Sequence, residues 1–137
     1  MSTPVILTVD DSSMLRKALV ELFRPYDCQL LQAPDGLVGL AVVREHHPDL
    51  VLLDYNMPVL DGLGMLRELR ADPAIARTNV IMLTANSAPQ TIAMIARLGV
   101  REYVLKPHDG PSLLAKAARI IKLVPRENAV THPVPHV

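Results

Sequence analysis

The sequence predicts an α/β fold in which a parallel sheet of five strands is covered by helices on both faces. Short apolar segments alternate along the chain with longer segments whose apolar residues recur at helical spacing. The short segments are apolar throughout, which is typical of strands buried on both faces of a parallel sheet. The chain has 137 residues, the length of one such domain.

The expected strands are short and bounded by polar residues. They are Val5–Val9, Cys28–Ala33, Leu50–Leu53, Val80–Leu83 and Glu102–Leu105. The expected helices follow each strand in turn, with apolar stripes through Leu15–Phe23, Leu37–Arg44, Leu63–Leu69, Ile92–Leu98 and Leu114–Ile121.

Several helix ends carry recognisable signals. Ser12 or Ser13 can cap the first helix. Ser87 and Gln90 have the spacing of a capping box before the fourth helix. Gly99 lies where the C-terminal cap of that helix is expected.

Composition excludes several classes of protein. The 14 basic and 14 acidic residues give a net charge of +0, which argues against a nucleic-acid partner because neutralising phosphates needs an excess of Lys and Arg. The single cysteine, Cys28, excludes an internal disulfide framework and fits a reducing compartment. No segment approaches the roughly 18 consecutive apolar residues of a membrane span. Asp10 and Asp11 interrupt the N-terminal apolar segment early, so we do not expect a secretory signal. We therefore expect a cytoplasmic protein.

The chain changes character near its C-terminus. Residues 1–124 carry the periodic pattern and form the expected domain. Residues 125–137 contain Pro125, Pro133 and Pro135 without a periodic apolar face. We expect this segment to be a flexible tail.

Polar side chains follow four of the expected strands where each strand ends. Asp10 and Asp11 follow the first strand, Asp54 the third, Thr84 the fourth and Lys106 the fifth. In an open parallel sheet these carboxyl ends meet at one edge, where ligands bind. Residues far apart in the sequence are therefore expected to form one site.

Carboxylates gathered in one place repel one another, and an unpaired one has its pKa raised. A divalent cation removes the repulsion, and the oxygen-only ligand set favours Mg²⁺. Such a site can accept a phosphoryl group, with a carboxylate as nucleophile. Asp54 is the better candidate because it stands alone after a central strand. Lys106 and Mg²⁺ would offset charge on the phosphoryl oxygens, and Thr84 would donate a hydrogen bond to one of them.

The motifs at these strand ends, taken together, resemble those of the response-regulator receiver domain of two-component signalling, in its stand-alone, chemotaxis-receiver-like form. The resemblance covers roughly Pro4 to Leu123. It rests on the segments Val9-Asp10-Asp11-Ser12, Leu53-Asp54-Tyr55-Asn56-Met57-Pro58, Asp61-Gly62, Leu83-Thr84-Ala85 and Tyr103-Val104-Leu105-Lys106-Pro107.

The resemblance implies a flavodoxin-like, doubly wound sheet with strand order 2-1-3-4-5. It implies that Asp54 is phosphorylated and takes part in binding Mg²⁺. Asp11 would ligate the ion directly, Asp10 mainly through water, and Asn56 through its backbone carbonyl. Lys106 would pair with the phosphoryl group, and its bond to the following proline would be cis.

The resemblance also implies a switch and a set of partners. Thr84 would move toward the phosphate and the ring of Tyr103 would turn inward, changing the surface formed by the fourth helix, fifth strand and fifth helix. A sensor histidine kinase or a histidine phosphotransfer protein would donate the phosphate, and an effector protein would read that surface. We expect no DNA-binding or catalytic output domain, because 137 residues leave no room for one beside the receiver domain. We expect a signalling protein that assists its own phosphorylation and dephosphorylation without being a dedicated enzyme.

Three alternatives are compatible with parts of this pattern. A haloacid-dehalogenase-like phosphatase also uses an aspartate nucleophile, but it carries a second acid two residues later, where this chain has Asn56. A degenerate receiver that acts only as a scaffold is disfavoured by the intact acceptor residues. A phosphate sink without its own effector is not distinguished from a signalling adaptor by these residues.

Overall fold

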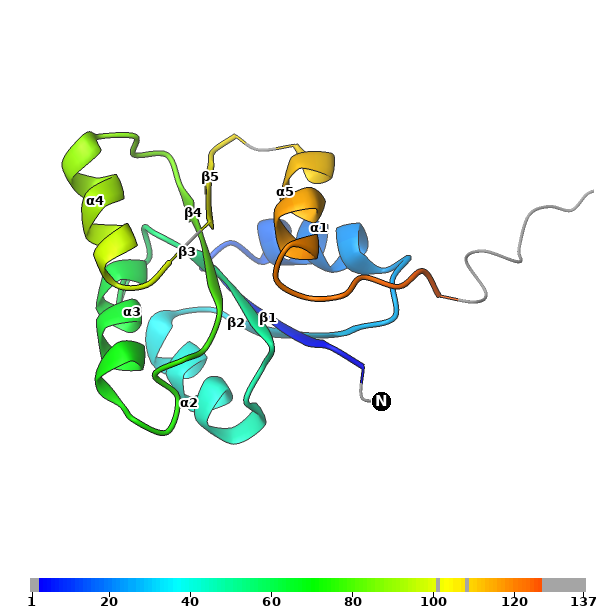
Figure 1. Cartoon of the computed structure of the whole chain (residues 1–137), viewed down its shortest axis with the longest axis horizontal. Helices are drawn as coiled ribbons and strands as arrows, with labels where there is room; N and C mark the ends of the chain where they lie inside the picture. Colours follow the sequence, from blue (N-terminus) through cyan, green and yellow to red (C-terminus); the bar gives the residue numbers. More distant parts are fainter. Residues whose placement is uncertain (1–2, 101, 108, 127–137) are drawn as a thin grey trace, which may run out of the picture.

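A parallel sheet forms the centre of the computed structural model, which describes residues 3–100, 102–107 and 109–126 (Figure 1). Its strands are β1 (Val5–Val9), β2 (Gln29–Ala33), β3 (Leu50–Asp54), β4 (Val80–Thr84) and β5 (Glu102–Leu105). They form one five-stranded sheet in the order β2-β1-β3-β4-β5, and every pairing is parallel. The predicted fold class and strand order are confirmed.

Helices cover both faces of this sheet. They are α1 (Ser13–Phe23), α2 (Gly36–His46), α3 (Gly62–Ala71), α4 (Pro89–Arg97) and α5 (Gly110–Ala118). Figure 1 shows α1 and α5 on one face and α2, α3 and α4 on the other. None of the helices in the described part of the chain is long and apolar enough to cross a membrane.

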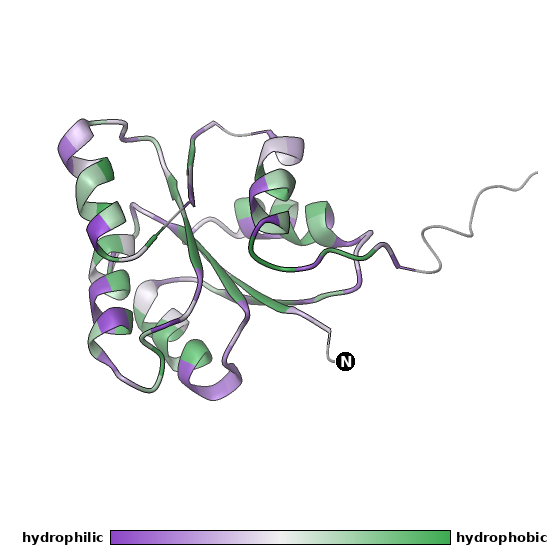
Figure 2. Cartoon of the chain, viewed as in Figure 1, coloured by the Kyte–Doolittle hydropathy of each residue, from purple (hydrophilic) through white to green (hydrophobic). Residues whose placement is uncertain are grey.

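The strand β3 shows why the apolar segments are unbroken. Leu50 and Leu52 pack into the core beneath α1 and α5, whereas Val51 and Leu53 pack into the core beneath α2, α3 and α4. Successive side chains of a strand point to opposite faces, so a strand between two cores must be apolar at every position. Figure 2 shows the central strands as the most continuously hydrophobic part of the fold.

The ends of the helices agree with the sequence only in part. The Ser12 hydroxyl accepts a hydrogen bond from the Leu15 amide at 3.2 Å, as a capping residue of α1 should. The capping box predicted at Ser87 is wrong: Ala88 is the cap residue of α4 and makes no side-chain cap bond. Pro89 occupies the first turn of α4, where its missing amide hydrogen costs nothing, and it sets the start of the helix.

The C-terminal end of α4 agrees with expectation, whereas that of α5 differs by three residues. Leu98 caps α4, and Gly99 follows it with a φ of +79°, a conformation that favours glycine. The helix α5 ends at Ala118, before Ile121. Ile121 is nevertheless buried in the core beneath α1 and α5, which explains why its apolar character extended the helical pattern in the sequence.

The first two residues of the predicted tail lie against the loop between α1 and β2. Pro125 forms an antiparallel bridge with Tyr26. The Arg126 amide donates to the Pro25 carbonyl at 2.8 Å, and its Nη2 donates to the Cys28 carbonyl at 3.0 Å. The remainder of the predicted tail, residues 127–137, lies outside the described residues.

Candidate functional site

The carboxyl edge of the sheet brings together the acidic residues that follow β1 and β3. One carboxylate oxygen from each of Asp10, Asp11 and Asp54 lies within 4.8 Å of the others. The register explains this proximity, because Val9 of β1 is paired with Leu53 of β3 and the next residues on both strands are aspartates. A shared register between parallel strands thus places side chains 44 positions apart at the same level.

A lysine completes the cluster. Lys106 follows the last residue of β5, and its Nζ donates a hydrogen bond to Oδ1 of Asp54. Asp54 is only 3% exposed. The Lys106–Pro107 peptide bond is cis, as the family resemblance implied. The nucleophile candidate is therefore a buried carboxylate held by one cation.

Asp10 is a buried carboxylate whose two oxygens differ in their hydrogen bonds. Its Oδ1 accepts a hydrogen bond from the Ser12 amide at 2.8 Å. Its Oδ2 is buried and accepts no hydrogen bond from the described part of the chain. The pKa of Asp10 is raised, chiefly by burial and further by the negative charge of Asp54, while the Ser12 hydrogen bond opposes the rise.

These observations test whether a magnesium ion fits the site. Three carboxylates face one ammonium group, so negative charge is in excess. The ligands available are all hard oxygens, the type that Mg²⁺ prefers, and Oδ2 of Asp10 supplies an acceptor that receives no hydrogen bond from the described residues. The residues present therefore fit a divalent cation. Asn56, the expected backbone ligand, lies in the loop between β3 and α3, and no described residue donates to its carbonyl.

Thr84 ends β4 and is fully buried. Its Oγ1 accepts a hydrogen bond from the Asn86 amide at 2.9 Å. The hydroxyl faces the Asn86 carbonyl at 3.5 Å, too far for a strong bond. The threonine is thus tied through Asn86 to the loop that leads into α4, and its hydroxyl hydrogen is weakly held.

Tyr103 lies on β5 and is half-buried against the core beneath α2, α3 and α4. It is paired in register with Met82, two residues before Thr84 on β4, so both predicted switch residues lie on the same face of the sheet. Lys116 of α5 donates to the Tyr103 carbonyl at 3.1 Å, and its Nζ lies 5.9 Å from the ring centroid. The ring therefore lies against this core and beneath Lys116 of α5.

Two further residues shape the site although the sequence assigned them no role in it. Arg16 of α1 donates from Nη1 to the Asp10 carbonyl at 2.5 Å and from Nε to Gln32 at 3.1 Å, which fixes the end of β1. A contact to a backbone carbonyl has no sequence motif. Gly62 begins α3 so close to β3 that a Cβ on it would overlap the Asp54 carbonyl oxygen and lie 2.8 Å from Cα of Tyr55. The Asp61-Gly62 pair after a buried strand was the available clue.

Comparison with known proteins agrees with this arrangement. The sequence matches the response regulator receiver domain over residues 6–118. It is 34% identical over 118 residues to the chemotaxis protein CheY-3 of Vibrio cholerae, covering 85% of this chain and 91% of that protein. It is 33% identical over 120 residues to the chemotaxis protein CheY of Pseudomonas aeruginosa, covering 87% of this chain and 97% of that protein.

Solved structures resemble the fold as a whole. The chemotaxis protein CheY4 of Vibrio cholerae superposes with a TM-score of 0.81 at 25% identity, covering 88% of this chain and all of the other. The receiver domain of the sensor histidine kinase PA1611 of Pseudomonas aeruginosa, determined with a magnesium ion coordinated in its active site cleft, gives a TM-score of 0.77 at 26% identity, covering 87% and 98%. The haloacid-dehalogenase alternative finds no support in these matches. The chain belongs to the response-regulator receiver domain family of two-component signalling.

Proposed function

We propose that Asp54 accepts a phosphoryl group from the phosphohistidine of a sensor kinase or a histidine phosphotransfer protein, in a reaction that depends on Mg²⁺. A phosphoryl-accepting role is general for the family. The observation that carries the proposal for this chain is the convergence of Asp10, Asp11 and Asp54 with the ammonium group of Lys106.

The transfer requires one nucleophile and one leaving group. A carboxylate oxygen of Asp54 forms a bond to phosphorus while the N–P bond of phosphohistidine breaks. The electron pair of that bond stays on the imidazole nitrogen, which takes a proton from solvent, and Asp54 becomes an acyl phosphate. Hydrolysis of this acyl phosphate by water restores the carboxylate.

Each remaining residue acts on charge or orientation. Lys106, which pairs with the Asp54 carboxylate, can follow the negative charge onto a phosphoryl oxygen after transfer. Asp10, Asp11 and the Asn56 carbonyl would hold the metal. When bound, Mg²⁺ offsets charge on the phosphoryl oxygens.

We further propose that Thr84 and Tyr103 report the phosphorylated state. A phosphoryl oxygen is a stronger acceptor than the Asn86 carbonyl at 3.5 Å, so the Thr84 hydroxyl would turn to it. This movement alters the loop into α4 and the space beside Tyr103 on the same sheet face. The surface formed by α4, β5 and α5 would then bind an effector protein.

The proposal also covers the domain organisation, the cellular compartment and the kind of activity of this protein. Residues 1–124 act as one receiver unit, followed by a tail, and the protein works in the cytoplasm, where a single buried thiol such as Cys28 needs no disulfide partner. The chain assists its own phosphorylation and dephosphorylation without serving as a dedicated enzyme. Asn56 supports this, because an amide cannot transfer the proton that a phosphatase needs at this position.

Phosphorylation with acetyl phosphate and Mg²⁺ tests the proposal. The wild type is expected to gain one phosphoryl group by intact-protein mass spectrometry, whereas Asp54→Asn gains none because an amide is a poor nucleophile. Omission of Mg²⁺ should abolish labelling. The control is Asp61→Asn, an exposed cap of α3 that should label normally. Labelling of Asp54→Asn equal to that of the wild type would reject Asp54 as the acceptor.

A further inference from the structure

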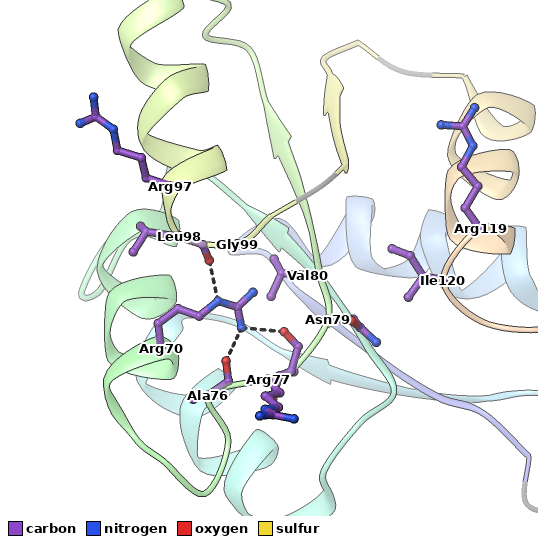
Figure 3. A pocket seen from close by; sticks show the side chains of 11 residues that line it. Arg70, Ala76, Arg77, Asn79, Val80, Arg97, Leu98, Gly99, Arg119 and Ile120 are labelled. Atoms are coloured by element: carbon purple, nitrogen blue, oxygen red, sulfur yellow. Dashed lines mark hydrogen bonds between the residues drawn. The ribbon is translucent and has the colours of Figure 1, made fainter.

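A basic groove lies at the edge of the sheet opposite to Asp54, where the strands begin and where α3, α4 and α5 end (Figure 3). It consists of a cavity of about 580 Å³ and an adjoining one of about 380 Å³. Both cavities are lined by the residues 77–79 and Ile120, so they form one continuous depression. We define the groove by its charged lining residues, which are Arg70, Arg77, Arg97, Arg119, Lys122 and Asp49.

The charge of this groove differs sharply from that of the chain. Its lining holds five of the 14 basic residues and one of the 14 acidic residues. The one carboxylate, Asp49, already accepts a hydrogen bond from the Val5 amide at 2.7 Å. A protein of net charge +0 therefore concentrates positive charge at the edge opposite to its acidic cluster.

Most of these cations have no partner within the described ranges. Arg77, Arg97 and Lys122 are exposed and make no ion pair or side-chain hydrogen bond with any described residue. The other two are held, Arg119 by Glu102, whose Oε2 lies 3.1 Å from its Nη1, and Arg70 by backbone carbonyls. The groove thus offers at least three cations whose charge is not offset locally.

Arg70 forms the floor of the groove and is fixed in place. Its Nε donates to the Leu98 carbonyl at 2.5 Å, and its Nη1 donates to the carbonyls of Ala76 and Thr78 at 3.0 and 2.7 Å (Figure 3). Its Nη2 makes no hydrogen bond to the described residues. Burial lowers the pKa of this guanidinium, as expected for a cation held mainly by neutral carbonyls. A rigid donor therefore remains available to a ligand.

The arrangement of the cations favours one class of ligand. Figure 3 shows the side chains of Arg97, Arg119 and Arg77 reaching in different directions, so they do not converge on a single phosphate. The lining contains no aromatic side chain on which a base could stack, which disfavours single-stranded nucleic acid. Carboxylates spaced along an extended peptide match dispersed cations better than a single phosphate or a single-stranded nucleic acid does.

We propose that this basic groove binds an extended acidic segment of a partner protein. Because the groove and the phosphorylation site lie at opposite edges of the sheet, both can be occupied at once. Binding in the groove is then independent of the state of Asp54. Such a contact would tether a partner to the receiver while the α4–β5–α5 surface changes with phosphorylation.

Fluorescence polarisation with labelled octaglutamate at low ionic strength tests this inference. The wild type is expected to bind saturably, and Arg77→Gln/Arg97→Gln should bind roughly tenfold more weakly, as the loss of two exposed ion pairs would give. Lys17→Gln/Arg67→Gln is the matched control, because it removes the same charge at exposed sites outside the groove. This control should stay within about twofold of the wild type, and high salt should weaken binding by screening.

Several outcomes would overturn the inference. Equal weakening in both double variants would show attraction to net charge alone. The absence of saturable binding, or an unchanged affinity in the groove variant, would exclude the site. Tighter groove-dependent binding of a labelled single-stranded octanucleotide would assign the groove to nucleic acid. Asp54→Asn should bind octaglutamate like the wild type, so failure of the phosphorylation proposal and failure of this one can be told apart.

Discussion

At the scale of single residues, Asp10 shows how a site can oppose the stability of its own fold. Its Oδ2 is buried without a hydrogen bond to the described residues, beside two other carboxylates. In the absence of divalent cations, we expect Asp10→Asn to raise the free energy of unfolding by about 1 kcal/mol, because a buried unpaired charge is removed. Urea denaturation measures this, and a less stable variant would contradict it. Added Mg²⁺ should stabilise the wild type and leave the variant unchanged.

The same prediction has a pH dependence with a definite sign. The pKa of Asp10 is raised in the folded state, so the folded protein binds more protons than the unfolded chain between the two pKa values. The amount by which the free energy of unfolding of Asp10→Asn exceeds that of the wild type should therefore shrink as pH falls through the raised pKa.

Asp72 provides the opposite case, since the Ala74 amide and Arg44 lower its pKa. The stabilisation from Asp72 is present above its unfolded pKa and is lost as pH falls through its folded pKa.

Thr8, like Asp10, carries a buried side-chain oxygen that makes no hydrogen bond to the described residues. It lies in the middle of β1 and is fully buried. We expect Thr8→Val to raise the free energy of unfolding by about 1 kcal/mol, because the hydroxyl is desolvated without compensation and Val has nearly the same shape. Thr78→Val is the control: its hydroxyl donates to the Ile75 carbonyl at 2.8 Å, so this change should destabilise. Denaturant unfolding of both variants checks the pair, and destabilisation by Thr8→Val would indicate a bound water.

At the scale of elements, the contact between the start of α3 and the end of β3 positions Asp54. Gly62 donates from its amide to the Tyr55 carbonyl at 3.0 Å, and its Cα approaches the β3 backbone too closely for a side chain. We expect Gly62→Ala to destabilise the fold by about 1–3 kcal/mol, since backbone must move to admit the methyl group. It should also slow labelling by acetyl phosphate, because the strand end that carries Asp54 is displaced.

Gly64, in the same helix, is the matched control for Gly62. A Cβ there would meet Cδ1 of Leu60 at 2.7 Å, the end of a half-buried side chain that can rotate. The clash is offset by the helix propensity of Ala, which is about 1 kcal/mol better than that of Gly. Gly64→Ala should therefore leave stability and labelling nearly unchanged. Equal effects at both positions would argue against a backbone contact at Gly62.

At the scale of the whole molecule, the proposed switch links the phosphorylation site to α4. Addition of beryllium fluoride and Mg²⁺, a phosphoryl mimic, is expected to change amide hydrogen exchange in the segment 85–91 of the wild type. Thr84→Ala should still be phosphorylated but should show a much smaller change, because it lacks the hydroxyl that reaches the mimic. Hydrogen-exchange mass spectrometry measures this. An undiminished change in Thr84→Ala would place the coupling elsewhere.

The parts of the fold that could be predicted are those with local causes. The unbroken apolar strands follow from burial between two cores, as Leu52 and Leu53 on opposite faces of β3 show. Prediction of helix ends from local sequence failed where tertiary packing extended an apolar pattern beyond the helix or where another residue set the helix start. Ile121 looked helical because it packs into the core beyond the end of α5, and Ser87 looked like a cap although Pro89 sets the start of α4.

The fold class and the residue types at the strand ends could be predicted without a structure, because periodicity and turn chemistry are properties of neighbouring residues. The structure was needed to show that Asp10 and Asp54 lie at the same level of the sheet, through the pairing of Val9 with Leu53, and that Oδ2 of Asp10 is buried without a hydrogen bond to the described residues. It also gathered the basic groove from segments more than 70 positions apart. Register, desolvation and the assembly of distant charges depend on long-range packing, which no local pattern encodes.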